Sequence, residues 1–156
     1  MPTVSVIIPF HNRVKWVAEA VQSVLDQTYS NFEVILVDDG STEDITQCNF
    51  INDNRIRYIR QDNRGPAVAR NRGIDVALGR YVAFLDSDDL FLPTKLEIQI
   101  AHMEDHPNVP FSHTSYQRIS KAGEPLEIIN SGRFTGKVYP EILLNSHTRT
   151  RTTEPR

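Results

Sequence analysis

The stretch "YVAFLDSDDLFLP", from Tyr81 to Pro93, joins a run of apolar residues to a dense group of acids. The run is typical of a buried β-strand, and three carboxylates follow it directly, Asp86, Asp88 and Asp89. Crowded carboxylates repel one another unless a cation neutralises them. Their hard oxygen atoms favour Mg²⁺ or Mn²⁺ over zinc, and these ions commonly bridge to substrate phosphates. The stretch therefore predicts a site for a metal and a phosphorylated ligand, unless Asp88 or Asp89 only caps the next helix within a solvated turn.

Before this stretch, the chain alternates strands with helices. Apolar runs rich in β-branched residues predict buried strands at Val4–Ile8 and Phe32–Val37, and a period of two predicts a half-buried strand at Arg55–Arg60. Apolar spacing, caps and prolines predict helices over 14–25, from the N-cap Ser41, over 64–79, and from Pro93 to about Glu104. This order predicts an α/β fold with a mainly parallel sheet, right-handed crossovers and flanking helices.

The carboxyl ends of the four predicted strands are rich in polar residues, and ligands of open parallel sheets bind beyond such ends. The segments that follow the strands are 9–12, 38–41, 62–65 and 86–89. Asp38 and Asp39 are also good turn and cap residues, which is a purely structural reading. In the functional reading, one of the two turns inward and accepts a hydrogen bond from a base N–H or a ribose hydroxyl, because a buried unpaired charge is costly.

The predicted helix over 64–79 brings an arginine toward the same edge. Six residues share the face that we expect to meet the sheet: Ala67, Arg70, Asn71, Ile74, Ala77 and Leu78. An arginine in that position needs an anion. The sequence leaves two partners open for Arg70, a phosphate of a ligand or one of the aspartates in a structural ion pair.

The character of the chain changes after Pro107. Alternation over 109–119, a turn at "KAGEP" and a return over 126–129 predict an antiparallel hairpin. Residues 137–145 are compatible with a helix or a loop, and 146–156 lack periodicity and are expected to be disordered. We therefore expect one domain over 1–145 and a tail over 146–156.

Composition excludes several classes of protein. The 156 residues carry a formal net charge of −3, which gives no basic field for nucleic acid. Cys48 is the single cysteine, so an internal disulfide and a cysteine metal cage are excluded. The sequence shows no membrane span and no signal peptide, and a cytoplasmic location is the default expectation. Incomplete burial of apolar surface would favour self-association into a homo-oligomer.

Three segments together resemble the family 2 glycosyltransferases of GT-A fold: "VSVIIPFHN", "QTYSNFEVILVDDGSTE" and "RGPAVARNRGIDVALGRYVAFLDSDD". The resemblance covers roughly Pro2 to Asp105. It implies a Rossmann-like nucleotide-diphospho-sugar transferase fold, a nucleotide-diphosphate sugar as donor, most typically a UDP-sugar, and a divalent cation, Mn²⁺ or Mg²⁺. It also implies direct displacement with inversion at the anomeric carbon and a saccharide or lipid-linked glycan as acceptor.

The resemblance also assigns roles to individual residues. Pro9 and His11 would flank the nucleotide base, although tyrosine is more usual at position 11 of this motif. Asp39 would accept from the base, and Arg70 would approach the base or the diphosphate. In the D-x-D motif, Asp86 would hold the ribose side of the donor and Asp88 the metal. The donor-binding set is Pro9, His11, Asp39, Arg70, Asp86, Ser87 and Asp88.

The catalytic base implied by the resemblance is a carboxylate beyond the hairpin. No motif after Asn130 matches it, and Glu124, Glu127 and Glu141 lack a supporting pattern. We therefore expect a complete donor half and an incomplete acceptor half, and the alternative function is nucleotide-sugar binding without transfer. A sugar-nucleotide pyrophosphorylase and a dinucleotide oxidoreductase are disfavoured, because "PFHNRVKW" has no glycine and no G-x-G-x-x-G follows a strand.

Overall fold

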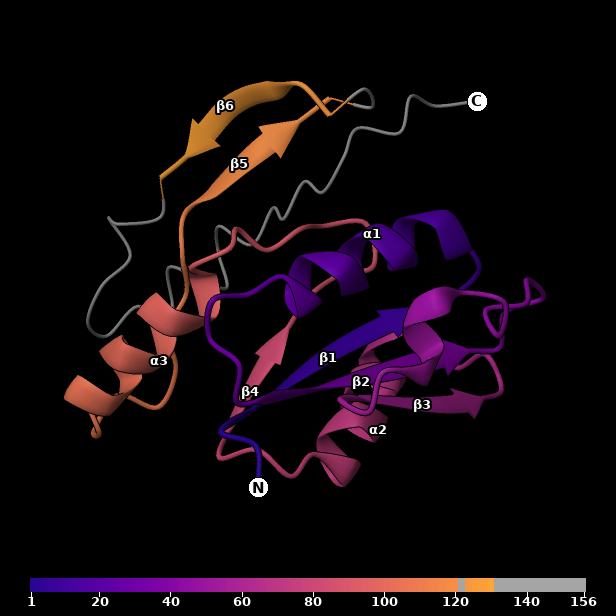
Figure 1. The fold of residues 1–156 in the computed structure, drawn as a ribbon, viewed down its shortest axis with the longest axis horizontal. Helices are drawn as coiled ribbons and strands as arrows, with labels where there is room; N and C mark the ends of the chain where they lie inside the picture. The colour runs from indigo at the N-terminus through magenta and orange to yellow at the C-terminus, as the bar shows by residue number, and fades with distance from the viewer. Residues whose placement is uncertain (121–122, 131–156) are drawn as a thin grey trace. The chain divides into compact units, whose positions relative to one another are not determined.

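The computed structural model describes residues 1–120 and 123–130. The chain divides into two compact units, Met1–Asp105 and the part from His106 onward. The first unit contains every residue that the sequence places in the donor site. Figure 1 shows the path of the chain.

The first unit is built on a parallel sheet of four strands in the order β3-β2-β1-β4. Its strands are β1 (Val4–Phe10), β2 (Phe32–Asp39), β3 (Ile56–Gln61) and β4 (Tyr81–Phe84). Its helices are α1 (Val14–Leu25), the 3₁₀ helix η1 (Asn49–Asn52), α2 (Pro66–Val76) and α3 (Lys95–Asp105). The predicted α/β fold with a mainly parallel sheet and flanking helices is confirmed. Figure 1 shows α1 and α2 on opposite faces of this sheet.

Strand β1 is buried on both faces, as its continuous apolar run predicts. Successive side chains of a strand point to opposite faces. Val6 and Ile8 accordingly join Val17 of α1 in one core cluster, whereas Ile7 joins Ala69 of α2 in the other. The two clusters hold the sheet between two helical layers, and the carboxyl end of β1 thereby lies at a rigid edge.

The helix predicted to begin after Ser41 is not formed, and the segment contains only the short η1 at Asn49–Asn52. The side chain of Asn12, far away in sequence, accepts hydrogen bonds from the N–H groups of Thr42 and Glu43. Ser41 accepts from the Asn12 N–H instead of capping a helix. These long-range contacts tie the segment after Ser41 to the loop after β1, and local sequence does not specify them.

The predicted inner face of α2 is also wrong in part. The buried residues of α2 are Ala69 and Gly73, whereas Ile74 and Leu78 are 44% and 59% exposed. Gly73 explains the shift, because a Cβ at this position would lie 2.5 Å from the Cγ2 atom of Ile7. The small residues turn toward β1 and allow close packing, and the larger apolar ones point outward.

Strand β4 forms one edge of the four-stranded sheet, and it is less buried than its sequence predicts. Its alternate residues Val82 and Phe84 are 41% and 46% exposed. They lie opposite Ser5 and Ile7 in the register with β1. The described part of the chain therefore leaves an apolar strip along this edge.

The second unit contains an antiparallel pair of strands, β5 (Tyr116–Ile119) and β6 (Pro125–Ile129), which confirms the predicted hairpin. An ion pair between Arg118 and Glu127 joins the two strands. The predictions for 137–145 and for the tail 146–156 lie outside the described residues. Among those that are described, no helix has the length and apolar character needed to cross a membrane.

Candidate functional site

The carboxyl ends of β1, β2 and β3 lie side by side at one edge of the sheet. The register pairs Phe10 with Asp38 and Asp39 with Gln61, so the three strands end at nearly the same level. Strand β4 runs parallel to β1 on the other side and leads into the acidic stretch that begins at Asp86. The topology thus collects the polar residues of four separate loops, as the sequence predicts.

Asp39 turns inward and is 4% exposed. One carboxylate oxygen, Oδ1, accepts from the Gln61 side chain at 2.8 Å and from the Arg64 N–H at 2.9 Å, and Oδ2 accepts from the Gly65 N–H at 2.8 Å. Burial by itself raises the pKa of Asp39, but these hydrogen bonds outweigh it, and the pKa is lowered from its ordinary value. Asp39 is therefore ionised and fixes the loop between β3 and α2.

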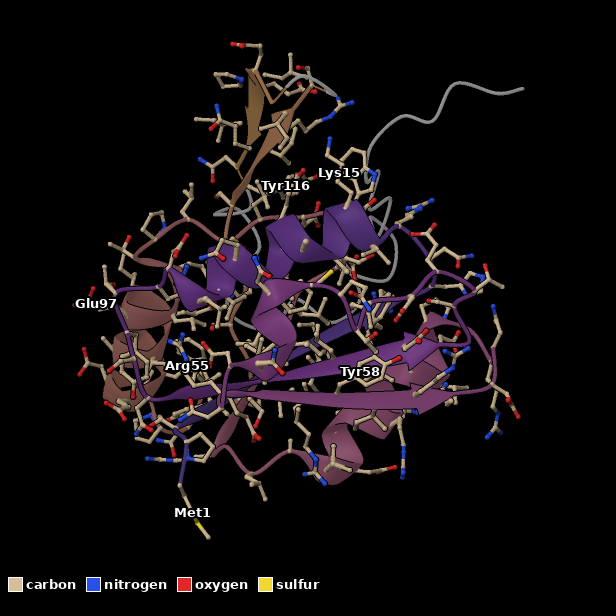
Figure 2. The ribbon with its side chains drawn as sticks, turned by 45° about the vertical axis from the view of Figure 1, so that its right-hand side comes forward. Met1, Lys15, Arg55, Tyr58, Glu97 and Tyr116 are labelled. Atoms are coloured by element: carbon tan, nitrogen blue, oxygen red, sulfur yellow. The ribbon has the colours of Figure 1, made fainter. Side chains whose placement is uncertain are left out.

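Asp38 has a structural role. It is 1% exposed and accepts from the Ser41 N–H and the Tyr58 hydroxyl, each at 2.7 Å. The Arg60 guanidinium lies 3.7 Å from the same carboxylate. Tyr58 projects from β3 and is labelled in Figure 2. Burial, followed by the hydrogen bond to Asp38, raises the pKa of Tyr58 to about 12, so the hydroxyl stays a donor. Asp38 therefore stabilises the turn after β2, whereas its neighbour Asp39 lies at the candidate site.

Arg70 forms an ion pair with Asp86. This is one of the two partners that the sequence leaves open for the arginine. Both side chains remain about one-third exposed, at 33% and 38%, so the pair is accessible to solvent. Exposed ion pairs contribute only about 0–1 kcal/mol, and a bound anion can replace the carboxylate at small cost. The donor roles of Arg70 and Asp86 stay predictions.

Asp88 lies 3.5 Å from the guanidinium of Arg13, which follows β1. The carboxylate of Asp88 is 19% exposed and the arginine 58%. Ser87, between the two acids of the D-x-D motif, is half-buried. Asp89 donates its N–H to the carbonyl of Asp86 at 3.0 Å, which closes the turn. Each acid of the motif therefore has a basic partner from a different part of the chain, Arg70 of α2 for Asp86 and Arg13 after β1 for Asp88.

The predicted metal site can be tested against these donors. Within residues 1–120 and 123–130, no three side chains of the His, Cys, Asp or Glu type converge to hold a metal. Asp88 still fits a Mg²⁺ or Mn²⁺ site of the kind in which one or two carboxylates act together with phosphate oxygens and waters. The donor set is thus compatible with a metal that arrives with a diphosphate, and not with a cage made by the protein alone.

Pro9 and His11 differ in accessibility. Pro9 is buried within β1, whereas His11 is exposed just beyond it. His11 contacts the Asp39 carbonyl through Nδ1 at 2.9 Å. It also lies next to the side-chain amide of Asn63, so His11 after β1 contacts residues at the ends of both β2 and β3. The sequence assigned no role to Asn12 or Asn63, and to Ser41 only that of an N-cap, although all three lie in the strand-end segments 9–12, 38–41 and 62–65.

Two open pockets in the first unit lie elsewhere. One of about 700 Å³ is bordered by Gln22, Leu25, Cys48 and Phe50, and one of about 390 Å³ by Pro2, Asn31, Phe32 and Arg55. Neither includes a predicted donor-site residue. Arg55, labelled in Figure 2, lies toward the opposite end of β3 from its carboxyl end. These two pockets are therefore separate from the candidate site.

The sequence is similar to known glycosyltransferases. The profile of "Glycosyl transferase family 2" matches residues 5–152. An uncharacterised glycosyltransferase of Rickettsia felis is 54% identical over 142 residues, which cover 90% of this chain and 23% of that protein. The UDP-Glc:alpha-D-GlcNAc-diphosphoundecaprenol beta-1,3-glucosyltransferase WfaP of Escherichia coli is 44% identical, over 74% of this chain and 47% of its own length. The chain spans only 20–23% of the length of its Rickettsia relatives.

Solved structures share the fold. The Staphylococcus aureus protein TarS, residues 1–349 in complex with UDP-GlcNAc, superimposes with a TM-score of 0.63 at 27% identity, covering 76% of this chain and 40% of that one. The mannosyltransferase PcManGT from Pyrobaculum calidifontis, in complex with GDP-Man and Mn²⁺, has a TM-score of 0.60 at 24% identity. It covers 75% of this chain and 36% of its own. Both likenesses agree with the GT-A-like arrangement of the parallel sheet and its helices.

Proposed function

The chain belongs to glycosyl transferase family 2, and from this premise we propose that it binds a nucleoside-diphosphate sugar for transfer to an acceptor hydroxyl. A UDP-sugar is the donor proposed first, because TarS was solved with UDP-GlcNAc and the name of WfaP specifies UDP-Glc. The acceptor is proposed to be a saccharide or a lipid-linked glycan, the second of which is the kind of acceptor in the name of WfaP.

One observation supports donor binding most directly. The edge of the sheet presents carboxylates and guanidinium groups in alternation, with Asp88 beside Arg13 and Asp86 beside Arg70. A diphosphate with its divalent cation carries the complementary pair of charges. Asp88 would take the cation, Arg13 and Arg70 would take phosphate oxygens, and Asp86, released by Arg70, would become free to accept from another donor of the ligand.

The individual roles follow from the contacts. Asp39 is ionised and holds the loop at Arg64 and Gly65, and we propose that its free acceptor capacity is used by a base N–H. Arg70 would exchange Asp86 for the diphosphate, which leaves Asp86 free to accept from a ribose hydroxyl. Pro9 would shape the floor of the base site, since it is buried, and Ser87 would line it from the turn of the D-x-D motif.

Asp88 is the proposed ligand for Mn²⁺ or Mg²⁺. Bound there, the cation would stabilise the negative charge that develops on the leaving nucleoside diphosphate. Arg70 would contribute in the same direction from the other side of the site. Transfer would proceed by direct displacement, with inversion at the anomeric carbon, once a carboxylate base removes the proton of the acceptor hydroxyl.

The alternative function is donor binding without transfer, and the second unit gives a specific reason to consider it. Glu127 forms an ion pair with Arg118 across the hairpin. Glu124 is exposed and lies in the turn of the hairpin, with its N–H donated to Ser120 Oγ. Glu141 lies outside the described residues. Neither Glu124 nor Glu127 is therefore marked as the base by its contacts.

A thermal-shift titration with UDP and Mn²⁺ tests the proposed function. At a ligand concentration 100 times the dissociation constant, binding adds about 2.7 kcal/mol, which corresponds to a rise in Tm on the order of 10 °C. Asp88→Ala is expected to lose most of the metal-dependent part of the rise. The unaltered chain with no UDP-dependent rise, with or without Mn²⁺, would contradict the proposal. Sugar release from a UDP-sugar, measured separately, distinguishes transfer from binding alone.

A further inference from the structure

The loop that follows β1 has an unusual backbone. Asn12 and Arg13 have φ angles of 57° and 63°, in the left-handed region that few residues other than glycine enter. Asparagine tolerates this region better than most side chains, and the conformation directs the Asn12 amide toward the loop after β2. A strained conformation of this kind persists only where the surrounding contacts hold it in place.

Those contacts are made by the side chain and the backbone of Asn12. Its Oδ1 accepts from the N–H and the hydroxyl of Thr42, at 2.8 and 3.1 Å, and from the Glu43 N–H at 3.3 Å. Its own N–H donates to Ser41 Oγ at 2.7 Å. Backbone N–H groups can only donate, so the atom that faces Thr42 and Glu43 has to be the amide oxygen. The orientation of the Asn12 amide is thereby determined.

The amide orientation in turn decides which nitrogen of His11 carries the proton. The remaining NH₂ group of Asn12 lies 3.2 Å from His11 Nε2 and can only donate, so Nε2 has to accept. On the other side of the ring, Nδ1 lies 2.9 Å from the carbonyl of Asp39, which can only accept. Both contacts require the same neutral tautomer, with the proton on Nδ1. Asn63 does not select a tautomer, because its NH₂ lies at similar distances, 3.2 and 3.4 Å, from both ring nitrogens.

We propose that Asn12 is a positioning residue that holds neutral His11 as the Nδ1–H tautomer, in a fixed orientation beside Asp39, for contact with the nucleobase of the donor. This inference rests on the proposed function. Since both ring nitrogens are engaged by the protein, the exposed ring of His11 offers a ligand its face and not a hydrogen-bonding edge. His11 therefore stacks on the base, as an aromatic ring without nitrogen atoms would.

The test compares variants of Asn12 in the full chain. Asn12→Asp keeps an acceptor for Thr42 and Glu43 but turns a second oxygen toward His11 Nε2, which then has to carry a proton. Asn12→Gly permits the left-handed backbone and removes both sets of side-chain contacts. Asn54→Asp, an exposed substitution that has the same change of charge, is the control.

The readout is the NMR shifts of the two His11 nitrogens at alkaline pH, assigned with His11→Phe. The unaltered chain is expected to show a pyrrole-type Nδ1 and a pyridine-type Nε2, and the Asn54→Asp control the same pattern. Asn12→Asp is expected to protonate Nε2, and Asn12→Gly to mix the two tautomers. A proton on Nε2 in the unaltered chain, an unchanged pattern in Asn12→Asp, or an equal change in Asn54→Asp would overturn the proposal.

UDP binding, measured by calorimetry on the same variants, separates this inference from the proposed function. Loss of the fixed ring orientation in Asn12→Asp is expected to weaken UDP binding by about fivefold, the equivalent of one hydrogen bond. His11→Ala is expected to weaken it by roughly tenfold or more, and His11→Phe by clearly less than His11→Ala, because the stacking face remains. UDP binding that is equal in His11→Ala and the unaltered chain would overturn the contact with the base. Failure of the unaltered chain to bind UDP would contradict the proposed function, while the imidazole pattern still decides the role of Asn12.

Discussion

Asp39→Asn is the most informative single substitution for the stability of the strand-end edge. The change is nearly isosteric, so it tests hydrogen bonding and charge without a change in volume. Asp39 accepts three hydrogen bonds, two on Oδ1 and one on Oδ2. An asparagine has one oxygen and one NH₂ group, and its amide can take two orientations. With the NH₂ group in place of Oδ2, it faces the Gly65 N–H. With the NH₂ group in place of Oδ1, it faces both the Arg64 N–H and the Gln61 amide. At least one partly buried donor loses its acceptor.

The magnitude follows from the number of bonds lost. Hydrogen bonds to charged groups contribute about 1.5–3 kcal/mol each, and the orientation of the asparagine that keeps Oδ1 in place loses the fewest. We therefore expect Asp39→Asn to lower the free energy of unfolding by about 2–4 kcal/mol at neutral pH, measured by urea denaturation. Asp62→Asn, an exposed substitution in the same loop, is the matched control and is expected to have little effect.

The dependence on pH provides an independent check. The pKa of Asp39 in the folded chain lies below its ordinary value of 3.8. The carboxylate therefore contributes stability that is fully present above the unfolded pKa and is lost as the pH falls through the folded pKa. The difference between the unaltered chain and Asp39→Asn should accordingly be constant from neutral pH to about pH 5 and shrink below about pH 4. Equal stability of Asp39→Asn and Asp62→Asn at neutral pH, or a difference that grows on acidification, would refute the reasoning.

Three further substitutions test other parts of the structure. Gly73→Ala is expected to lower the free energy of unfolding, because its Cβ would meet Ile7 at 2.5 Å and overpacking costs about 1–3 kcal/mol, more than the helix propensity gained; a more stable variant in urea denaturation would contradict this. Arg13→Gln removes the partner of Asp88 and is expected to strengthen Mn²⁺ binding up to about fivefold in calorimetry, whereas weaker binding would show that the arginine does not compete with the cation. Phe84→Thr is expected to reduce self-association at high concentration in light scattering, and an unaltered chain that is monomeric throughout would remove the basis for this expectation.

The buried strands could be predicted from sequence because a local run of apolar, β-branched residues is enough to indicate them. Val4–Ile8 and Phe32–Val37 are apolar, β-branched runs, and the structure contains β1 and β2 at these positions, extended at their carboxyl ends into Phe10 and Asp39. The parallel arrangement follows from the helices between them. The helix expected after Ser41 is not formed, and the start of that segment is instead bonded to Asn12, a residue of another loop that local sequence cannot bring there.

At the candidate site, the positions of the residues along the chain could be predicted, but their contacts with residues far away in sequence could not. The sequence places the acids at the strand ends because they follow apolar runs, and it brings Arg70 toward the same edge through the helix over 64–79. It does not pair them, because pairing requires the sheet order β3-β2-β1-β4, which brings Arg13 after β1 next to Asp88 after β4. The role of Asn12 was not predictable either, since it depends on a left-handed backbone and on partners about 30 residues away.

The pairing also explains how the ligand-free chain tolerates so many acids at one edge. Asp38 has Arg60 nearby, Asp86 has Arg70, and Asp88 has Arg13, whereas Asp39 is compensated by N–H groups. If a donor binds at this edge as proposed, its binding would be an exchange of partners. A cation that binds Asp88 without a nucleotide would have to displace Arg13 from this carboxylate and leave the arginine without an anion. We therefore expect the cation alone to bind weakly. A nucleoside diphosphate supplies that anion in the same step, so cation and nucleotide are expected to bind cooperatively, each increasing the affinity for the other by the same factor.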